Sequence, residues 1–238
     1  MEKYYYSRFF VASDYKNSDF IVEIPKVWWS RSYEYAWASQ FVSPEDITLD
    51  AACGLEHPLK FFLLDHCKES HACDHDERIL NHSELEKAFL QAFGTEALEE
   101  FPKRYLQDVQ FKQASLSKLP YPAKHFDKIY CISVLEHLTD WFNKYVWLLS
   151  LNKVLTFAPR MIEHSLSEFR RVLKDDGLIV LTFDYPRINL AYFKWLIENL
   201  GFEFAGPVDF SLPPDALYSK NHKLHCFRAV IRKKGETG

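Results

Sequence analysis

The sequence is poor in glycine and has no long apolar segment. Only 7 of its 238 residues are glycine, whereas glycine usually makes up about 7% of a protein. No apolar run reaches the ~18 residues that a membrane-spanning helix needs. The first residues, 1–6, lack the apolar core of a signal peptide. We therefore expect no membrane partner and no secretory leader.

An excess of basic residues is also missing, and the cysteines are too few for a disulfide scaffold. Lys and Arg number 29 against 33 Asp and Glu, for a net charge of −4, which argues against a strongly basic nucleic-acid-binding protein. Five cysteines, an odd number, predict free thiols in a reducing cytoplasm. The hydrophobic share of 47% is enough to form a core, which excludes wholesale disorder.

Aromatic residues, in contrast, are abundant and gather near the N-terminus. They make up 16% of the chain. Trp29, Tyr33 and Trp37 recur at helical spacing, which predicts a helix with one buried face. We divide the chain into an aromatic N-terminal cap, residues 1–42, and a main domain, residues 43–238. Composition alone leaves open whether these rings form core, an interface or the wall of an apolar ligand site.

The main domain alternates short apolar segments with helical ones. Strands are predicted at 47–49, 70–73, 109–112, 126–132, 178–183, 202–204 and 224–231. This alternation predicts an α/β fold with a doubly wound, mostly parallel sheet. The last strand follows a loop and is a candidate for antiparallel pairing. Gly177 and Gly201 are predicted to end the helices that precede them.

Several small or polar residues follow the predicted strands, where ligands bind in sheets of this kind. They are Asp50–Gly54, Asp74, Ser115–Leu116 and Cys131–Ser133. Small residues after the first strand let backbone N–H groups approach a ligand. Asp74 lies 20 residues past Gly54, about where an acid meets ribose hydroxyls in dinucleotide-binding folds. An acid after a strand is also commonly a solvated helix cap, so neither acid is decisive alone.

Five segments, in order, resemble the motifs of class I S-adenosylmethionine-dependent methyltransferases. They are Leu49–Gly54, Ala72–Asp74, Phe111–Pro122, Phe126–Leu138 and Glu168–Gly177. Together they span roughly residues 43–185. The resemblance implies a Rossmann-like, seven-stranded sheet with an aromatic N-terminal helical cap. It also implies methyl transfer from S-adenosylmethionine, with S-adenosylhomocysteine as product.

The chain departs from the family pattern at three positions. Ala52 replaces the usual first glycine, Glu56 the usual third, and Ser115 an Asp that often contacts the adenine amino group. Glu56 is acidic near the expected place of the methionyl carboxylate. It could point away, contact the amino group or weaken cofactor binding.

The resemblance implies cofactor contacts residue by residue. Asp50 is expected to hold the methionyl amino group, and Asp74 the ribose hydroxyls. Trp28 and Arg31 resemble the helix that closes over the cofactor, and Arg31 is a candidate partner of the methionyl carboxylate or, alternatively, a surface arginine. The other expected cofactor contacts are Ala52, Cys53, Gly54, His75, Ser115, Leu116, Cys131 and Ile132.

His137 is the candidate catalytic base. The resemblance places it just past the fourth strand, facing the acceptor, and imidazole titrates near neutral pH. A base helps only where the acceptor loses a proton, and a packed or capping histidine is the alternative. No nucleic-acid or protein-docking module is visible, so we expect a small-molecule acceptor. A helical insertion around 138–165 is expected to shape its pocket. The oligomeric state stays open.

Two further groups of residues have the composition of a binding site: a cluster of histidines and cysteines, and a basic C-terminal end. The soft ligands at close spacing lack the usual spacing of zinc ligands, so no metal is expected; they are His66, Cys67, His71, Cys73, His75 and His82. The basic end at 228–234 is short, so no nucleic-acid partner is expected. The alternative functions are a non-catalytic module that binds S-adenosylmethionine or S-adenosylhomocysteine, and a nicotinamide-dependent oxidoreductase. The oxidoreductase would need a loop richer in glycine.

Overall fold

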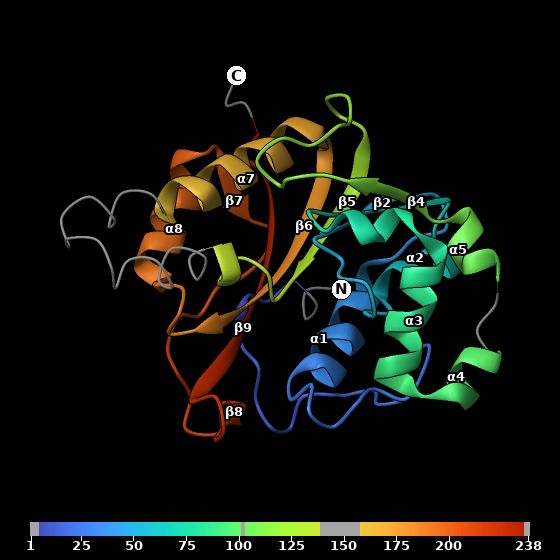
Figure 1. Cartoon of the computed structure of the whole chain (residues 1–238). Helices are drawn as coiled ribbons and strands as arrows, with labels where there is room; N and C mark the ends of the chain where they lie inside the picture. The colour runs from blue at the N-terminus through green and yellow to red at the C-terminus, as the bar shows by residue number, and fades with distance from the viewer. Residues whose placement is uncertain (1–4, 101–102, 139–157, 236–238) are drawn as a thin grey trace, which may run out of the picture.

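The computed structural model describes residues 5–100, 103–138 and 158–235, and a twisted sheet forms its centre (Figure 1). The strands are β1 (Arg8–Phe9), β2 (Ile47–Ala51), β3 (Glu69–Asp74), β4 (Gln110–Gln113), β5 (Phe126–Ile132), β6 (Leu173–Tyr185), β7 (Phe202–Phe204), β8 (Tyr218–Ser219) and β9 (Leu224–Lys233). The helices are α1 (Arg31–Ala38), α2 (Leu59–His66), α3 (His82–Phe93), α4 (Thr95–Glu100), α5 (Arg104–Asp108), α7 (Ala158–Val172) and α8 (Leu190–Asn199), with 3-10 turns η1 (Ser39–Phe41) and η2 (Glu77–Leu80).

The sheet is mostly parallel, as the alternation of strands and helices predicts. Its order is β1-β9-β6-β5-β2-β3-β4, and β7 and β8 also pair with β9. The pairs β2–β3, β2–β5, β3–β4 and β5–β6 are parallel, whereas β9 runs antiparallel to β6. The seven expected strands are therefore present, and the two-residue strands β1 and β8 extend the sheet along β9.

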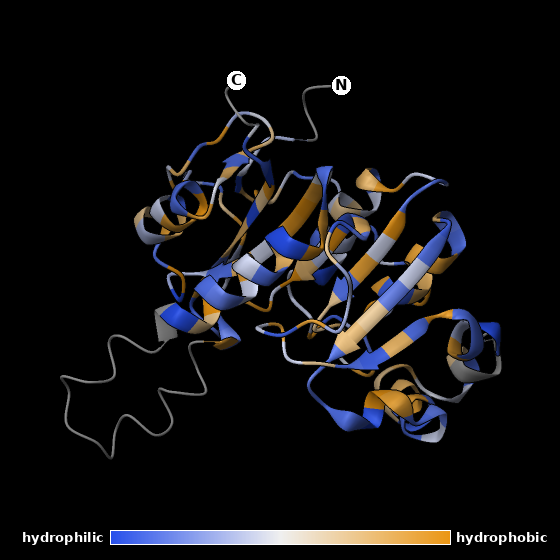
Figure 2. Ribbon diagram, turned by 90° about the horizontal axis from the view of Figure 1, so that it is seen from above, coloured by the Kyte–Doolittle hydropathy of each residue, from blue (hydrophilic) through white to orange (hydrophobic). Residues whose placement is uncertain are grey.

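Side chains from the central strands alternate between two buried layers. Ile129 and Cys131 of β5 belong to the core cluster that includes α7 and α8, whereas Tyr130 and Ile132 belong to the cluster that includes α1 and α2. In Figure 2 the central strands carry orange segments, and the helices outside them alternate between orange and blue. Because neighbouring residues of a strand point to opposite faces, this register places Asp50, paired with Tyr130, on the face of α1 and α2.

The N-terminal cap is joined to the sheet. Strand β1 pairs with β9 through Arg8↔Arg228 and Phe9↔Phe227. Tyr35 and Trp37 of α1 are buried in the core, whereas Trp28 is only half-buried. Half of the described aromatic residues of the cap are therefore buried, and the other half are at least partly exposed.

The helix before β6 ends earlier than the position of Gly177 predicts. Helix α7 ends at Val172, and Gly177 lies inside β6. A Cβ at Gly177 would lie 2.7 Å from the Leu173 side chain and 2.8 Å from the Asp127 carbonyl oxygen. The prediction of a C-terminal cap is therefore wrong, because the glycine permits close packing rather than a helix end. At Gly201 the prediction is confirmed: α8 ends at Asn199, and Gly201 has a φ of +74°.

The helical insertion expected around 138–165 falls largely on residues 139–157, which lie outside the described residues. All five cysteines are free thiols, as expected. Within the described part of the chain, no helix combines the length and the apolar character that crossing a membrane requires.

Candidate functional site

The loop after β2 turns sharply and joins the end of β3. Ala52 and Gly54 both have left-handed backbone conformations, with φ of 58° and 61°. The N–H of Cys53 donates to the Cys73 carbonyl at 3.0 Å, and the N–H of Gly54 donates to Asp74 Oδ2 at 3.0 Å. Ala52 adopts this conformation despite its methyl group, at a cost of roughly 1–2 kcal/mol. The loop therefore keeps a tight turn although Ala52 and Glu56 replace two of the three glycines of the family pattern.

Lys60 holds the carbonyl side of this loop. It is fully buried, and its ammonium group donates to the carbonyl oxygens of Gly54 at 2.9 Å and of His57 at 2.5 Å. The Cys53 carbonyl lies 3.4 Å from the same ammonium. A buried ammonium needs such partners, because desolvation otherwise disfavours its charge. The role of Lys60 was not predicted from the sequence, where the only indication of it is a single charge inside an apolar helical segment.

Asp50 is a buried carboxylate with an unsatisfied oxygen. The residue is 3% exposed, and no described residue donates a hydrogen bond to its Oδ2. Burial raises the pKa of Asp50 to about 7, the charge of Lys60 opposes this rise, and Asp74 adds to it. Because buried polar groups are nearly always paired, an unsatisfied oxygen here indicates a missing donor, such as the amino group of a ligand.

Asp74 ends β3 beside the loop and is already engaged by backbone groups. Its Oδ1 accepts from the N–H of Asp76 at 3.0 Å and lies 3.0 Å from Nδ1 of His75. The His75 side chain itself is 89% exposed. The first two strand-end acids are thus near enough for the charge of Asp74 to raise the pKa of Asp50.

Helix α1 is fastened to the strand ends by a buried carboxylate. Glu34 is fully buried, and it accepts hydrogen bonds from Arg31, from Ser133 at 2.7 Å and from Thr182. Burial favours the neutral form, but the charge of Arg31 and the two hydroxyls together hold the pKa of Glu34 below its usual value. Glu34 therefore positions Arg31 and links the cap to the ends of β5 and β6.

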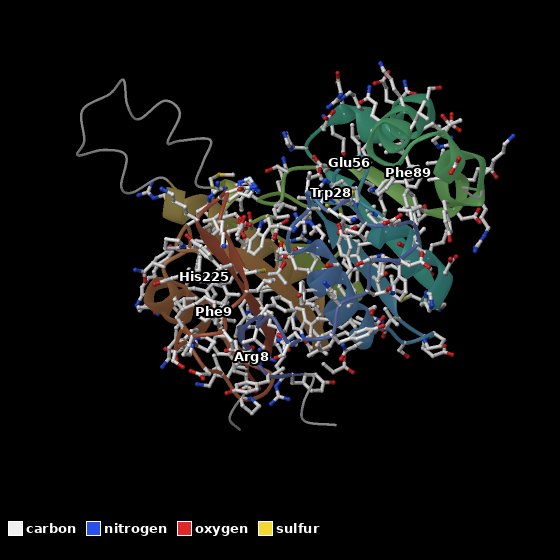
Figure 3. The ribbon with its side chains drawn as sticks, turned by 90° about the horizontal axis from the view of Figure 1, so that it is seen from below. Arg8, Phe9, Trp28, Glu56, Phe89 and His225 are labelled. Carbon is white, nitrogen blue, oxygen red and sulfur yellow. The ribbon has the colours of Figure 1, made fainter. Side chains whose placement is uncertain are left out.

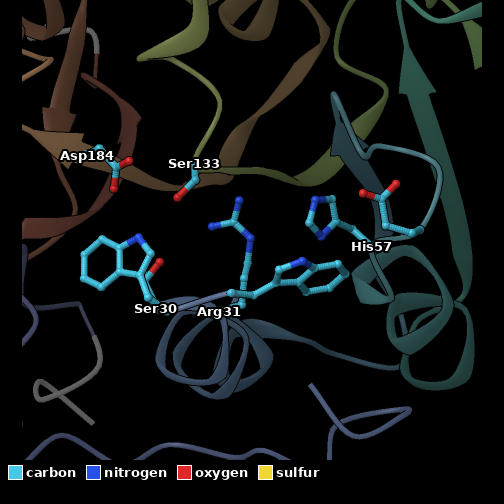
Figure 4. Close-up of a pocket in the computed structure, with 8 residues that line it drawn as sticks. Ser30, Arg31, His57, Ser133 and Asp184 are labelled. Carbon is cyan, nitrogen blue, oxygen red and sulfur yellow. The ribbon is translucent and has the colours of Figure 1, made fainter. Parts of the chain in front are cut away.

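A pocket of about 240 Å³ opens between α1, the loop after β2 and the ends of β5 and β6 (Figure 4). Figure 4 shows Asp184 and His57 on opposite sides, with Arg31 between them. Trp28 and Glu56, which both line the pocket, are labelled near each other in Figure 3. The pocket is lined by Trp28, Trp29, Ser30, Arg31, Glu56, His57, Ser133 and Asp184.

His57 closes the loop side of this pocket. Its ring lies 4.5 Å from that of Trp28, and Nδ1 lies 3.0 Å from the Tyr35 hydroxyl oxygen. Burial, with the charges of Arg31 and Lys60, lowers the pKa of His57 well below its usual value. A neutral imidazole held by Tyr35 therefore forms a fixed wall, and a Cβ at Gly54 would lie 2.7 Å from it.

Asp184 closes the opposite side. It lies near the end of β6, is 9% exposed, and receives no hydrogen bond from any described residue at Oδ1. Its backbone N–H donates to Glu136 at 3.3 Å. Burial and the charge of Glu34 raise the pKa of Asp184 to about 6, against the opposing charges of Arg187 and Arg31.

The structure separates the predicted site residues into distinct groups. Trp28 and Arg31 line the pocket. The strand ends and loop hold Asp50, Ala52, Cys53, Gly54 and Asp74. Ser115 and His75 are exposed, whereas Leu116, Cys131 and Ile132 are buried in the core.

His137 is exposed and is not among the residues that line the pocket. Sequence analysis missed Glu34 and Asp184 as well as Lys60. The spacing of Arg31 and Glu34, three residues apart on a helix, is the only local signal for Glu34. Asp184 follows the most apolar strand, as acids in such sheets commonly do, and that position was its signal.

Comparison with known proteins supplies an independent line of evidence. A family model described as a methyltransferase domain matches residues 49–181. No protein of curated function matches the chain at a significant level. Three solved structures share the fold at 14–16% identity.

The first is a TehB-like SAM-dependent methyltransferase from Corynebacterium glutamicum, with 16% identity, a TM-score of 0.51, and coverage of 84% of this chain and 87% of the other. The second is the cyclase SpnF, with 14% identity, a TM-score of 0.56, and coverage of 87% and 82%. The third is 1,6-didemethyltoxoflavin-N1-methyltransferase from Burkholderia thailandensis, with 16% identity, a TM-score of 0.51, and coverage of 88% and 82%. At these identities the likeness concerns the fold alone.

Proposed function

Because the chain belongs to the methyltransferase-domain family, we propose that it transfers a methyl group from S-adenosylmethionine to a small molecule bound in the pocket beside α1. The unsatisfied Oδ2 of buried Asp50 carries this proposal. An isolated buried carboxylate is costly, and a protein retains one where a bound ligand supplies the missing donor.

The residues at the strand ends fit S-adenosylmethionine. Asp50 holds the methionyl amino group, Asp74 exchanges its contact with the Gly54 N–H for the ribose hydroxyls, and Arg31 holds the methionyl carboxylate. Since Glu56 lines the same pocket as Arg31, we assign it a contact with the amino group. These roles use charge-assisted hydrogen bonds of suitable sign at each end of the ligand.

When bound, S-adenosylmethionine supplies an electrophilic methyl group on a sulfonium. The chain's own contribution is to align the acceptor and exclude water, which is the main source of rate in such a displacement. Trp28 and Trp29 supply apolar walls for this purpose. His137 remains the candidate base for acceptors that lose a proton.

We assign a small-molecule acceptor because the pocket is small. At about 240 Å³, it lies slightly below the ~300–1,000 Å³ of typical small-molecule sites. The walls from Trp28 and His57 leave room for a small, partly apolar group rather than a polymer. The 1,6-didemethyltoxoflavin-N1-methyltransferase from Burkholderia thailandensis, which shares the fold, was solved with 1,6-didemethyltoxoflavin and S-adenosylhomocysteine bound.

Calorimetry with S-adenosylhomocysteine tests the cofactor assignment. We expect binding by the wild-type protein and a loss of at least about tenfold in affinity for Asp50→Ala, equal to ~1.4 kcal/mol. Asp176→Asn, a change at an exposed site in β6, is the control and should bind as the wild type does. A wild-type protein that does not bind S-adenosylhomocysteine would refute the proposal.

Transfer of a labelled methyl group tests the acceptor class. The protein is incubated with labelled S-adenosylmethionine and separated fractions of a cell extract. Label is expected in the small-molecule fraction. Label confined to protein or nucleic acid contradicts the small-molecule assignment. Binding of S-adenosylhomocysteine without transfer to any fraction supports the alternative of a non-catalytic binding module.

A further inference from the structure

Asp184 lines the pocket but has no role in the proposed binding of the cofactor, so it is free to bind a second ligand. It lies at the far side of the pocket from the loop after β2, with Arg31 between (Figure 4). The exposed fraction of Asp184 is 9%, so 91% of its surface is buried. Its Oδ1 receives no hydrogen bond from any described residue. A buried carboxylate oxygen that faces a pocket and lacks a donor calls for a donor from the ligand.

The charge of the pocket favours a ligand of one kind. Its lining contains two carboxylates, Glu56 and Asp184, and one guanidinium, Arg31. Arg31 is already neutralised by its ion pair with Glu34. Since the cofactor assignment gives Arg31 to the methionyl carboxylate and Glu56 to the amino group, the charge left for the acceptor is that of Asp184, which attracts N–H donors.

The rings of the pocket point to the same chemistry. Trp28 and Trp29 line it together with Asp184. Aromatic faces attract positively charged nitrogen and also bury the apolar part of a ligand. A ligand with an amine at one end and a small apolar body matches both features.

We propose that the methyl acceptor is a small organic amine and that Asp184 binds its nitrogen. This inference rests on the proposed methyl transfer. The amine binds in its ammonium form, which donates an N–H hydrogen bond to the Asp184 carboxylate, and it releases one proton to solvent before the transfer. During transfer, the nitrogen lone pair forms the new N–CH₃ bond while the S–CH₃ bond breaks and its electron pair stays on sulfur. The surplus proton passes from nitrogen to Asp184.

The environment of Asp184 suits this proton transfer. Burial and Glu34 raise the pKa of Asp184 to about 6, closer to neutrality than an exposed carboxylate, and proton transfer is most efficient when the base titrates near the working pH. The contact from its own N–H to Glu136, at 3.3 Å, holds the end of β6 in place.

Three probes of similar shape test the proposal: benzylamine, benzyl alcohol and benzoate. Their binding is measured by calorimetry on the full chain saturated with S-adenosylhomocysteine. We expect benzylamine to bind at least about tenfold more tightly than benzyl alcohol, because its ammonium group forms an ion pair with the carboxylate whereas the alcohol is neutral. Benzoate is expected to bind most weakly. Equal binding of the three probes, tighter binding of benzoate, or no binding of benzylamine would overturn the proposal.

Asp184→Asn is the matched variant, since the amide has the same shape without the charge. We expect it to lose the preference for benzylamine while its affinity for S-adenosylhomocysteine stays within about twofold of the wild type. Asp215→Asn, at an exposed site, is the control and should keep the preference. A preference for benzylamine that survives in Asp184→Asn contradicts the role of Asp184. Failure of the wild type to bind S-adenosylhomocysteine instead counts against the proposed function.

Discussion

Replacing Asp50 by Asn is expected to stabilise the ligand-free protein while weakening its site. Burial raises the pKa of Asp50 from 3.8 to about 7. Folding therefore carries a penalty for the charged carboxylate, and a neutral amide of the same shape avoids it. The gain depends on pH, because the wild-type penalty exists only where the carboxyl group is ionised in the unfolded chain.

The sign of this dependence follows from the raised pKa. Below pH 3.8 the group is protonated in both the folded and the unfolded chain and contributes no difference. Between 3.8 and about 7 the folded protein binds the proton more tightly, so its stability falls as the pH rises. Above about 7 the penalty is complete. A rise from 3.8 to about 7 corresponds to about 4 kcal/mol at ~1.36 kcal/mol for each pKa unit.

The net gain is smaller, because the amide also lacks partners in this site. Burying an unpaired amide costs about 1–3 kcal/mol, which leaves a gain of about 2 kcal/mol for Asp50→Asn at pH 8. For a protein of this size, that gain raises the melting temperature by roughly 4–8 °C. At pH 3.5 the two proteins are expected to differ by less than about 1 kcal/mol, since both carry a neutral side chain.

Thermal and urea unfolding at several pH values between 3.5 and 8 measure this effect. The exposed Asp176→Asn should follow the wild-type profile. Saturating S-adenosylhomocysteine should stabilise the wild type more than Asp50→Asn, because the variant loses the charge that holds the amino group. An Asp50→Asn protein less stable than the wild type at pH 8, or a gain that does not change with pH, would refute the reasoning.

Three other substitutions test the surrounding contacts. Glu34→Gln leaves the guanidinium of Arg31 without its charge partner and should lower the free energy of unfolding by about 3 kcal/mol. The control Glu198→Gln, in an exposed pair with Lys194, should change it by less than about 1 kcal/mol. Equal effects of the two variants in urea unfolding would contradict the role of Glu34 in holding the cap to the sheet. Lys60→Met leaves the loop carbonyls without their donor and should lower the free energy of unfolding by about 2–3 kcal/mol. It should also weaken S-adenosylhomocysteine binding measured by calorimetry. Unchanged binding would show that the loop does not depend on this ammonium. His137→Ala distinguishes the two candidate proton acceptors: lower turnover with unchanged S-adenosylhomocysteine affinity supports His137, and unchanged turnover leaves Asp184 as the proton acceptor.

Local patterns predicted much of the fold because periodicity and turn residues report on short segments. The apolar segment 126–132 is β5, and Gly201 follows the end of α8 as expected. The boundary between α7 and β6 failed. The polar stretch Lys174–Asp176 followed by Gly177 is typical of a helix end, but β6 already begins at Leu173, whose side chain packs close to Gly177.

Only the residues of the site that lie in the family motifs, such as Asp50 and Asp74, could be predicted from the sequence. Asp50 and Asp74 follow strands that pair in parallel, so their approach follows from topology. Glu34 could not be found in this way, because its partners Ser133 and Thr182 lie 99 and 148 residues away. Helix α1 is rich in aromatic residues, and a charged residue in such a helix is expected on its exposed side, so only the packed structure shows that Glu34 is buried.

The amino-acid sequence alone determined three features, because each depends on spacing along a short stretch of chain. They are the order of strands and helices, the acids at the strand ends and the membership in a methyltransferase family. The tertiary structure alone decided which charges are desolvated. It turned Lys60 and Glu34 into supports of the loop and the cap, and it left single oxygens of Asp50 and Asp184 without donors. Desolvation and hydrogen bonding depend on groups that meet only after the chain has folded.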